Sequence, residues 1–226
     1  MRKKVELILL ILLLAGLVAV SRNLGEYVSS GKVKLTKKTV VIDPGHGGAD
    51  PGKIGINDAK EKDINLQVAK RVKKLLEDKG VKVIMTREKD QMLSEGSTGS
   101  KKVQDMKERV KLINDTAPDL AVSIHQNSYS GEEVHGAQVF YYTHSTDGEK
   151  LAEIMQKALL SVDRDNHRKA KADSTYYLLR RTEVPTIIVE CGFLSNYEEA
   201  EKLVDEKYQK QLAKAIVKGI ESCLAD

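Results

Sequence analysis

Two spacings of hydrophobic residues alternate along most of this chain. Six short runs rich in valine, isoleucine and tyrosine predict β-strands, at residues 39–43, 81–86, 120–125, 137–142, 176–179 and 186–190. Apolar residues that recur every three or four positions predict amphipathic helices, at residues 63–79, 101–116, 148–162 and 206–223. Strands that alternate with helices indicate the α/β fold class. We therefore expect a single three-layer domain, in which helices flank a mostly parallel sheet of roughly six strands.

The amino-terminal residues have a third pattern, typical of a membrane segment. Residues 5–20 form an apolar run that only Glu6 interrupts, and Arg2, Lys3 and Lys4 precede it. A basic cluster before an apolar run predicts an export signal or anchor whose amino terminus stays inside the cell. The run is somewhat shorter than a helix that spans a hydrocarbon core of roughly 30 Å. We expect the rest of the chain to face the extracytoplasmic space, either anchored to the membrane or secreted.

These patterns divide the chain into three parts. We expect a signal or anchor segment at residues 1–21, a polar tether at 22–37 and the folded domain at 38–226. Small residues at positions 19–21 leave open whether a signal peptidase removes the first segment. Within the domain, residues 94–100 are rich in serine and glycine and predict a flexible loop at the border of a substrate groove.

The composition excludes several classes of protein. At 226 residues, with 41% hydrophobic and 31% charged residues, the chain can bury the core of one domain. Its 37 basic and 33 acidic residues are interleaved and give a net charge of only +4, which argues against a nucleic-acid-binding protein. A mildly basic chain still tolerates an anionic surface such as a cell wall or a lipid headgroup layer. Cys191 and Cys223 are too few for a disulfide scaffold; two unpaired, buried thiols are favoured, and a bridge between them stays open.

Candidate functional residues stand where predicted strands end. The first strand runs into a glycine-rich segment, residues 44–48, which contains His46 and allows a ligand to approach the backbone closely. The segment lacks the spacing of a phosphate-binding or dinucleotide-binding loop, so a nucleotide site is not expected. His125 ends a later strand, and open α/β sheets place their sites at the carboxyl ends of strands. We therefore expect His46 and His125 to face a common site.

Two glutamates accompany these histidines. Glu61 stands at the start of a predicted helix, where a carboxylate taken alone is best explained as a cap of the free amides. Two histidines and a carboxylate are nonetheless a frequent ligand set for catalytic zinc, which keeps a fourth position open for water. Glu190 ends an apolar strand, where a purely structural residue is seldom charged, so it is a candidate catalytic residue.

Five short motifs occur in a fixed order in the chain from about residue 38 onward. They are Ile42-Asp43-Pro44-Gly45-His46-Gly47-Gly48, Glu61-Lys62-Asp63-Ile64-Asn65, Thr86-Arg87, Ser123-Ile124-His125-Gln126-Asn127 and Val189-Glu190-Cys191-Gly192-Phe193-Leu194-Ser195-Asn196. With these motifs the chain resembles the zinc-dependent N-acetylmuramoyl-L-alanine amidases of the amidase-3 type. The resemblance implies that His46, Glu61 and His125 hold one zinc ion per chain and that Glu190 is the catalytic glutamate. Gln126 replaces the alanine that is commoner in the family, and we expect this change to matter little.

The resemblance also implies a reaction and its setting. These amidases hydrolyse the bond between the lactyl group of N-acetylmuramic acid and the L-alanine of the peptidoglycan stem peptide. The short anchor and bare catalytic domain resemble the sporulation and germination branch, so we expect the chain in the forespore or spore cortex compartment. Peptidoglycan, a membrane and an accessory or activating protein are the expected partners, and nucleic acid is not.

Substrate contacts are expected from four polar residues near the motifs. Arg87 and Arg180 can pair with substrate carboxylates, although a structural ion pair explains each of them equally well. Asn127 follows His125 in its motif, and His135 precedes a predicted strand beside the site.

Two other functions stay open. A zinc peptidase that cuts stem or cross-link peptides would use the same metal chemistry, although the chain has no HExxH motif. A membrane-tethered binding or scaffold protein would keep the fold and a structural zinc, but it would have no need of Glu190.

Overall fold

The computed structural model describes residues 38–94 and 100–225. The expected anchor, the expected tether and most of the expected loop at 94–100 lie outside the described residues. Within the described part of the chain, no helix is long and apolar enough to span a bilayer. Lys38–Asp226 forms one structural unit.

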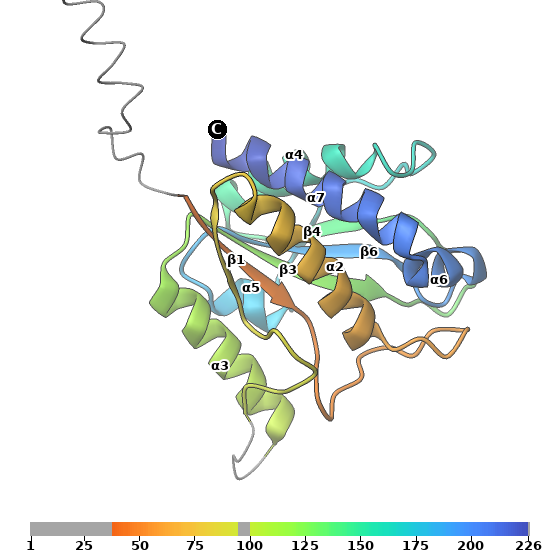
Figure 1. Ribbon diagram of the computed structural model, residues 1–226, viewed down its shortest axis with the longest axis horizontal. Helices are drawn as coiled ribbons and strands as arrows, with labels where there is room; N and C mark the ends of the chain where they lie inside the picture. Colours follow the sequence, from red (N-terminus) through yellow and green to blue (C-terminus); the bar gives the residue numbers. More distant parts are fainter. Residues whose placement is uncertain (1–37, 95–99, 226) are drawn as a thin grey trace, which may run out of the picture. The chain divides into compact units, whose positions relative to one another are not determined.

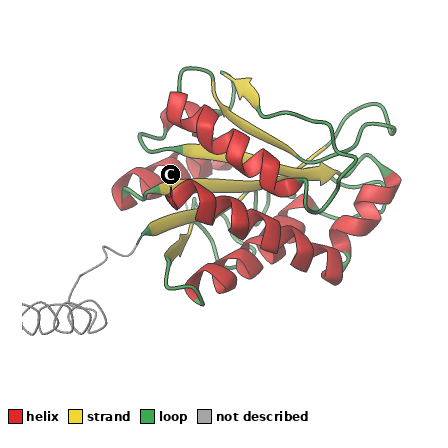
Figure 2. Cartoon of the chain, turned by 90° about the horizontal axis from the view of Figure 1, so that it is seen from above, coloured by secondary structure: helices red, strands yellow, loops and turns green. Residues whose placement is uncertain are grey.

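A six-stranded sheet forms the middle layer of this unit (Figure 1, Figure 2). Its strands are β1 (Thr39–Pro44), β2 (Lys82–Met85), β3 (Leu120–Asn127), β4 (Gln138–Tyr142), β5 (Lys171–Asp173) and β6 (Thr186–Phe193). They lie in the order β2-β1-β3-β6-β4-β5, and all neighbours are parallel except β4 and β6. The expected α/β fold with a mostly parallel sheet is therefore confirmed.

Helices cover both faces of the sheet. They are α2 (Glu61–Glu77), α3 (Lys101–Thr116), α4 (Thr146–Leu159), α5 (Tyr177–Arg181), α6 (Tyr197–Val204) and α7 (Glu206–Ala225). In Figure 1, α2, α4 and α7 lie together on one face of the sheet, and α3 and α5 lie on the other. The unit thus has the three layers that the sequence predicts.

The central strands are hydrophobic on both sides because both faces are covered. Val40 and Ile42 of β1 pack with α2 in the larger core cluster, whereas Val41 between them packs with Ile113 of α3 in the smaller one. All four side chains are fully buried. Burial on both faces explains why parallel strands appear in the sequence as unbroken apolar runs, without alternating polar residues. Polar side chains that bind a ligand are left to the carboxyl ends of the strands.

The sequence prediction is wrong for one strand and omits one helix. Residues 176–179, expected as a strand, lead into the short helix α5, which buries both Leu178 and Leu179. Tyrosines favour a strand, but two adjacent leucines in one core do not suit a strand, whose neighbouring side chains point to opposite faces. The fifth strand is instead β5, three residues without an apolar pattern. The omitted helix α6 has a recognisable start, since Asn196 caps it by accepting a hydrogen bond from the backbone N–H of Glu199.

Both edges of the sheet are short strands that carry an exposed lysine. Strand β2 has four residues and begins at Lys82, and β5 has three and begins at Lys171. The Lys171 ammonium lies 5.9 Å from the centre of the Phe140 ring on β4. The edges of the sheet therefore differ in length and polarity from its buried centre.

The two cysteines lie inside the domain and do not form a disulfide bridge with each other. Cys191 on β6 is fully buried, and Cys223 on α7 is nearly so. The favoured expectation, that the two thiols are buried and not bridged to each other, is confirmed.

Candidate metal centre

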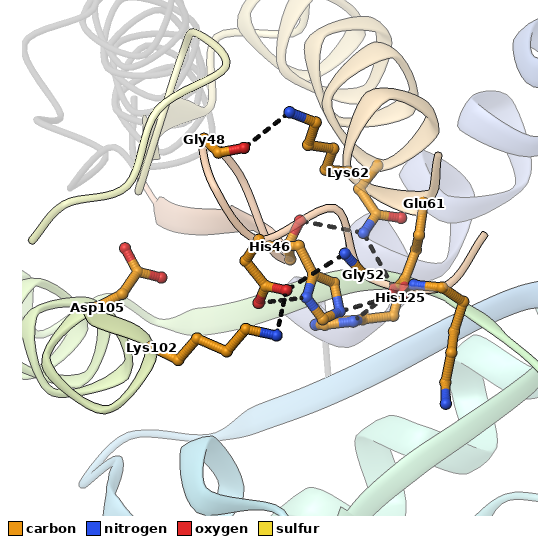
Figure 3. A network of polar contacts seen from close by, with 12 residues as sticks. His46, Gly48, Gly52, Glu61, Lys62, Lys102, Asp105 and His125 are labelled. Carbon is orange, nitrogen blue, oxygen red and sulfur yellow. Dashed lines mark hydrogen bonds and ion pairs between the residues drawn. The ribbon is translucent and has the colours of Figure 1, made fainter. Parts of the chain in front are cut away.

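Two histidines and a glutamate meet at one edge of the sheet. Strands β1 and β3 are parallel neighbours, so their carboxyl ends lie side by side. His46 follows β1, and His125 lies near the end of β3. Glu61 is the first residue of α2, which packs on both strands. Figure 3 shows the three side chains converging from these elements.

The three side chains offer ligand atoms for one metal ion. One ligand atom from each residue lies within 4.8 Å of the other two. His46 Nε2 is 3.2 Å from Glu61 Oε2, and His125 Nδ1 is 2.9 Å from Glu61 Oε1. The centres of the two imidazole rings are 5.1 Å apart, with the rings edge to face. Two nitrogen ligands and one carboxylate, with a fourth position free, are typical of a catalytic zinc site.

The backbone around His46 depends on its glycine neighbours. His46 has a φ of 61°, in the left-handed region, and Gly47 has a φ of 139°. A Cβ atom at Gly45 would overlap the His125 ring. A left-handed residue other than glycine is strained and persists only where its surroundings hold it. The glycines of this segment therefore allow the two histidines to approach each other.

Arg87 lies buried beneath this segment. It is 2% exposed, and its guanidinium donates hydrogen bonds to the backbone oxygens of Pro44, Gly45, Lys62 and Lys89. Its donors are thus used inside the domain, which speaks against the expected contact with a substrate carboxylate. The sequence does not reveal this role because burial of a guanidinium depends on contacts between distant segments.

Arg109 of α3 also holds the backbone of His46. Its guanidinium is 1% exposed and donates hydrogen bonds to the backbone oxygens of Pro44 and His46, at 2.8 and 2.6 Å. It also pairs with two buried carboxylates, Asp43 at 2.6 Å and Asp105 at 2.7 Å. Burial raises the pKa of Asp43, but Arg109 and two neighbouring hydroxyls overcome this effect and lower the pKa to about 2. An ion pair that the sequence pattern did not reveal therefore supports the strained residue.

Asp50 orients the imidazole of His46. Asp50 Oδ2 lies 2.9 Å from His46 Nδ1, and Asp50 Oδ1 lies 2.7 Å from Lys102 Nζ. A carboxylate at the second nitrogen of a metal-binding histidine fixes its tautomer and ring orientation. Sequence reasoning missed Asp50, although it stands four residues after His46 in a loop closed by two backbone hydrogen bonds between Gly47 and Asp50.

Glu61 does not use its carboxylate as a helix cap. Its oxygens accept hydrogen bonds from the backbone N–H groups of Lys53 and Gln126, at 2.8 and 3.2 Å. Burial raises the pKa of Glu61, but hydrogen bonds and charges from His125 and His46 lower it far below its usual range. Burial lowers the pKa of His125, yet Glu61 raises it to about 9. An ionised carboxylate between two imidazoles is a site that favours positive charge, as a bound metal ion would supply.

Glu190 lies beside His125 in the sheet. The two residues are register partners on β6 and β3. The hydroxyl of Tyr176 donates a hydrogen bond to Glu190 Oε1 at 3.2 Å, whereas Glu190 Oε2 is buried and has no hydrogen-bond partner among the described residues. Burial raises the pKa of Glu190; the charge of His125 opposes this shift, and the charge of Glu61 reinforces it. A buried carboxylate with one oxygen unused suits proton transfer.

One cavity of ≈ 520 Å³ joins these residues. Its lining includes His46, Glu61, His125, Glu190, Asp50, Lys53, Lys102, Asn127, Tyr176 and Tyr177. Of the expected substrate contacts, Asn127 lines the cavity, whereas His135 and Arg180 are exposed and do not. Lys102 is a lining residue that sequence reasoning missed. The structure therefore brings the four main candidates and Asn127 to one place.

Comparisons with known proteins agree with this site. A family model described as N-acetylmuramoyl-L-alanine amidase matches residues 40–222. The germination-specific N-acetylmuramoyl-L-alanine amidase of Bacillus subtilis (strain 168) is 42% identical over 189 residues, which cover 82% of this chain and 79% of the relative.

Solved structures give the same result. The CwlD amidase of Clostridioides difficile, solved in complex with the GerS lipoprotein, has a TM-score of 0.79 at 38% identity and covers 83% of this chain and 98% of that chain. An N-acetylmuramoyl-L-alanine amidase of Clostridium difficile 630 has a TM-score of 0.76 at 35% identity, over 84% of this chain and 97% of that chain. The chain therefore belongs to the N-acetylmuramoyl-L-alanine amidase family.

Proposed function

We propose that this chain is a zinc-dependent amidase that releases stem peptides from peptidoglycan, with His46, Glu61 and His125 as metal ligands and Glu190 as catalytic acid/base. The bond cleaved joins the lactyl carboxyl of N-acetylmuramic acid to L-alanine. The observation that carries the proposal is that Glu190, whose Oε2 has no hydrogen-bond partner among the described residues, lines the same cavity as the three candidate ligands.

The residues of the cavity have separate roles in hydrolysis. Bound zinc supplies Lewis-acid activation of the scissile carbonyl and of the attacking water. Glu190 Oε2 takes a proton from that water and passes it to the departing amine, while a new C–O bond replaces the C–N bond. Tyr176 holds the other oxygen of Glu190, and Asp50 keeps the ring of His46 in orientation. The products are a free stem peptide and an unsubstituted lactyl acid.

Substrate binding is proposed for Asn127 on the cavity wall. Lys102 lies on the same wall with a largely exposed side chain, and its ammonium suits a carboxylate of the stem peptide. Asn127 was also expected from the sequence, and Lys102 is a new candidate. Arg87, Arg180 and His135 do not line the cavity and are not included in the proposal.

The setting of the reaction is part of the proposal. The likeness to a germination-specific amidase supports action on spore cortex peptidoglycan, outside the cytoplasm. The C. difficile relative was solved with a lipoprotein, which supports an accessory protein for this chain as well. Residues 1–21 are proposed to hold the domain at the membrane or to export it.

Mass spectrometry of digested peptidoglycan tests the reaction. An amidase frees the amino group of L-alanine and leaves the lactyl acid without a peptide. A zinc peptidase would instead leave L-alanine attached to muramic acid and cut within the stem or the cross-link. The second pattern of products would contradict the proposal.

Removal of zinc should abolish this activity and leave the domain folded. A chelator is expected to stop release of stem peptides, and added Zn²⁺ to restore it, because the three ligands serve catalysis. The domain should stay folded because its hydrophobic core packs without these three residues. Circular dichroism before and after chelation checks the fold. A domain that unfolds on chelation, or peptidoglycan binding without turnover at any zinc concentration, would favour a scaffold with a structural zinc.

A further inference from the structure

Gln126 is connected to the candidate ligand Glu61 through buried amides. Gln126 is 2% exposed, and Asn65 is fully buried. Gln126 Nε2 donates a hydrogen bond to Asn65 Oδ1 at 3.1 Å, and Asn65 Nδ2 donates to Glu61 Oε1 at 3.3 Å. The same nitrogen of Asn65 donates to the backbone oxygen of Gly45 at 3.1 Å. The side chain of Gln126 therefore reaches the carboxylate of Glu61 through one intervening residue.

The direction of each bond follows from the acceptors at its end. A carboxylate oxygen of Glu61 and the backbone oxygen of Gly45 only accept hydrogen bonds, so the amide nitrogen of Asn65 has to face them. The amide oxygen of Asn65 then faces the other way and needs a donor. Gln126 Nε2 is the donor that meets it. An apolar side chain at position 126 would leave this buried oxygen without that partner and the Asn65 amide held at its nitrogen end only.

The amide oxygen of Gln126 is consistent with this orientation. Gln126 Oε1 is buried and has no hydrogen-bond partner among the described residues. Turned by 180°, the Gln126 amide would place its oxygen against the oxygen of Asn65. The observed orientation is therefore the one that satisfies Asn65.

We propose that Gln126 is a positioning residue, which holds the carboxylate of Glu61 in a metal-binding orientation through the amide of Asn65. The inference rests on the zinc site proposed above, and it gives a role to a residue that was expected to matter little. Side chains that orient a metal ligand without touching the metal typically change affinity about 10- to 100-fold when they are lost. The backbone N–H of Gln126 also donates to Glu61, at 3.2 Å, and substitution leaves this bond in place. A substitution at position 126 therefore tests only the hydrogen bonds from the Gln126 side chain through Asn65 to Glu61.

The test measures zinc affinity and fold stability separately in the full-length chain. Gln126→Met keeps the volume of the side chain and removes its amide, and Asn65→Leu removes the intervening amide. Zinc is stripped from each variant, its dissociation constant is measured by competition with a chromogenic chelator, and the Tm of the zinc-free protein is recorded. We expect Gln126→Met to bind zinc about 10-fold more weakly than the wild type. In the Asn65→Leu background, Gln126→Met should add no further loss.

Gln209→Ala is the matched control. Gln209 is a fully buried amide of α7 that donates hydrogen bonds to Gln67 Oε1 and the backbone oxygen of Leu203, and it does not line the cavity. We expect this variant to lower the Tm and to keep wild-type zinc affinity.

Three results would overturn the role of Gln126: unchanged zinc affinity in Gln126→Met, an equal loss in Gln209→Ala, or an additive loss in the double variant. If Asn65→Leu does not fold, the comparison of Gln126→Met with Gln209→Ala decides alone. Failure of the wild-type chain to bind zinc would instead overturn the proposed function, so the two failures are distinguishable.

Discussion

Glu190→Gln is expected to lower kcat by about 100- to 10,000-fold while the protein keeps its zinc and its fold. Glutamine has the shape of glutamate and can still accept the hydrogen bond from the Tyr176 hydroxyl. It cannot take a proton at the position of Oε2, the oxygen that has no hydrogen-bond partner among the described residues. Release of stem peptides from purified peptidoglycan measures kcat, and metal analysis measures zinc content.

Glu149→Gln is a matched control for this variant. Glu149 Oε1 also accepts a hydrogen bond from a tyrosine, Tyr141, at 2.8 Å, but the pair lies on the surface and away from the cavity. We expect wild-type kcat from this control. Wild-type turnover by Glu190→Gln, with zinc bound, would remove Glu190 from the mechanism.

Arg109→Met should lower the free energy of unfolding by about 3–5 kcal/mol, because it leaves buried carboxylates without their cation. The loss is a large part of the roughly 5–15 kcal/mol that stabilise a typical domain. The same change removes the hydrogen bond to the backbone of His46, so zinc affinity should fall as well. Denaturant titration of the zinc-free protein measures the first effect, and chelator competition measures the second.

The contribution of Arg109 also predicts a dependence on pH. The pKa of Asp43 is about 2 in the folded protein and 3.8 ordinarily. A lowered pKa gives stability that is present above the unfolded value and lost as the pH falls through the folded one. The difference in stability between wild type and Arg109→Met should therefore shrink as the pH falls from about 4 to about 2.

Arg71→Met is the control for an arginine outside the buried network. Arg71 pairs with the exposed Glu206 at 3.5 Å, and such pairs contribute at most about 1 kcal/mol. Equal losses of stability in Arg71→Met and Arg109→Met would show that the buried Arg109 contributes no more to the free energy of unfolding than Arg71 does.

The parts of the fold that the sequence predicts well are those with long periodic patterns. The helix at Lys101–Thr116 matches its prediction at both ends, and the central strands are found within a few residues of theirs. The weak predictions fall on short elements. Lys171–Asp173 is a strand of three exposed or half-exposed residues, whose pairing with β4 depends on a partner 31 residues earlier in the chain, as in Phe140 with Lys171. No local pattern reports such pairing.

Some residues of the candidate site could be predicted from the sequence, and others could not. His46 and His125 could be predicted because parallel strands bring their carboxyl ends together. Glu61 could not be assigned from its position alone, since a carboxylate at a helix start is usually a cap; its contacts with both histidines come from the tertiary fold. Tyr176 was expected in a strand, and its bond to Glu190 follows from a turn into α5 instead. Burial of Arg87 speaks against the expected substrate contact, but its guanidinium bonds backbone oxygens and not the carboxylate of the expected ion pair.

The two lysine-bearing edge strands limit how this protein can associate with copies of itself. An open sheet edge offers unpaired backbone groups to a strand of another chain, and short edges with charged side chains discourage that pairing. Strand β2 begins with exposed Lys82 and β5 with exposed Lys171, so each edge offers a short length of backbone and a positive charge. Aggregation by strand addition, a common fate of concentrated proteins with open sheets, is therefore disfavoured at both ends of this sheet.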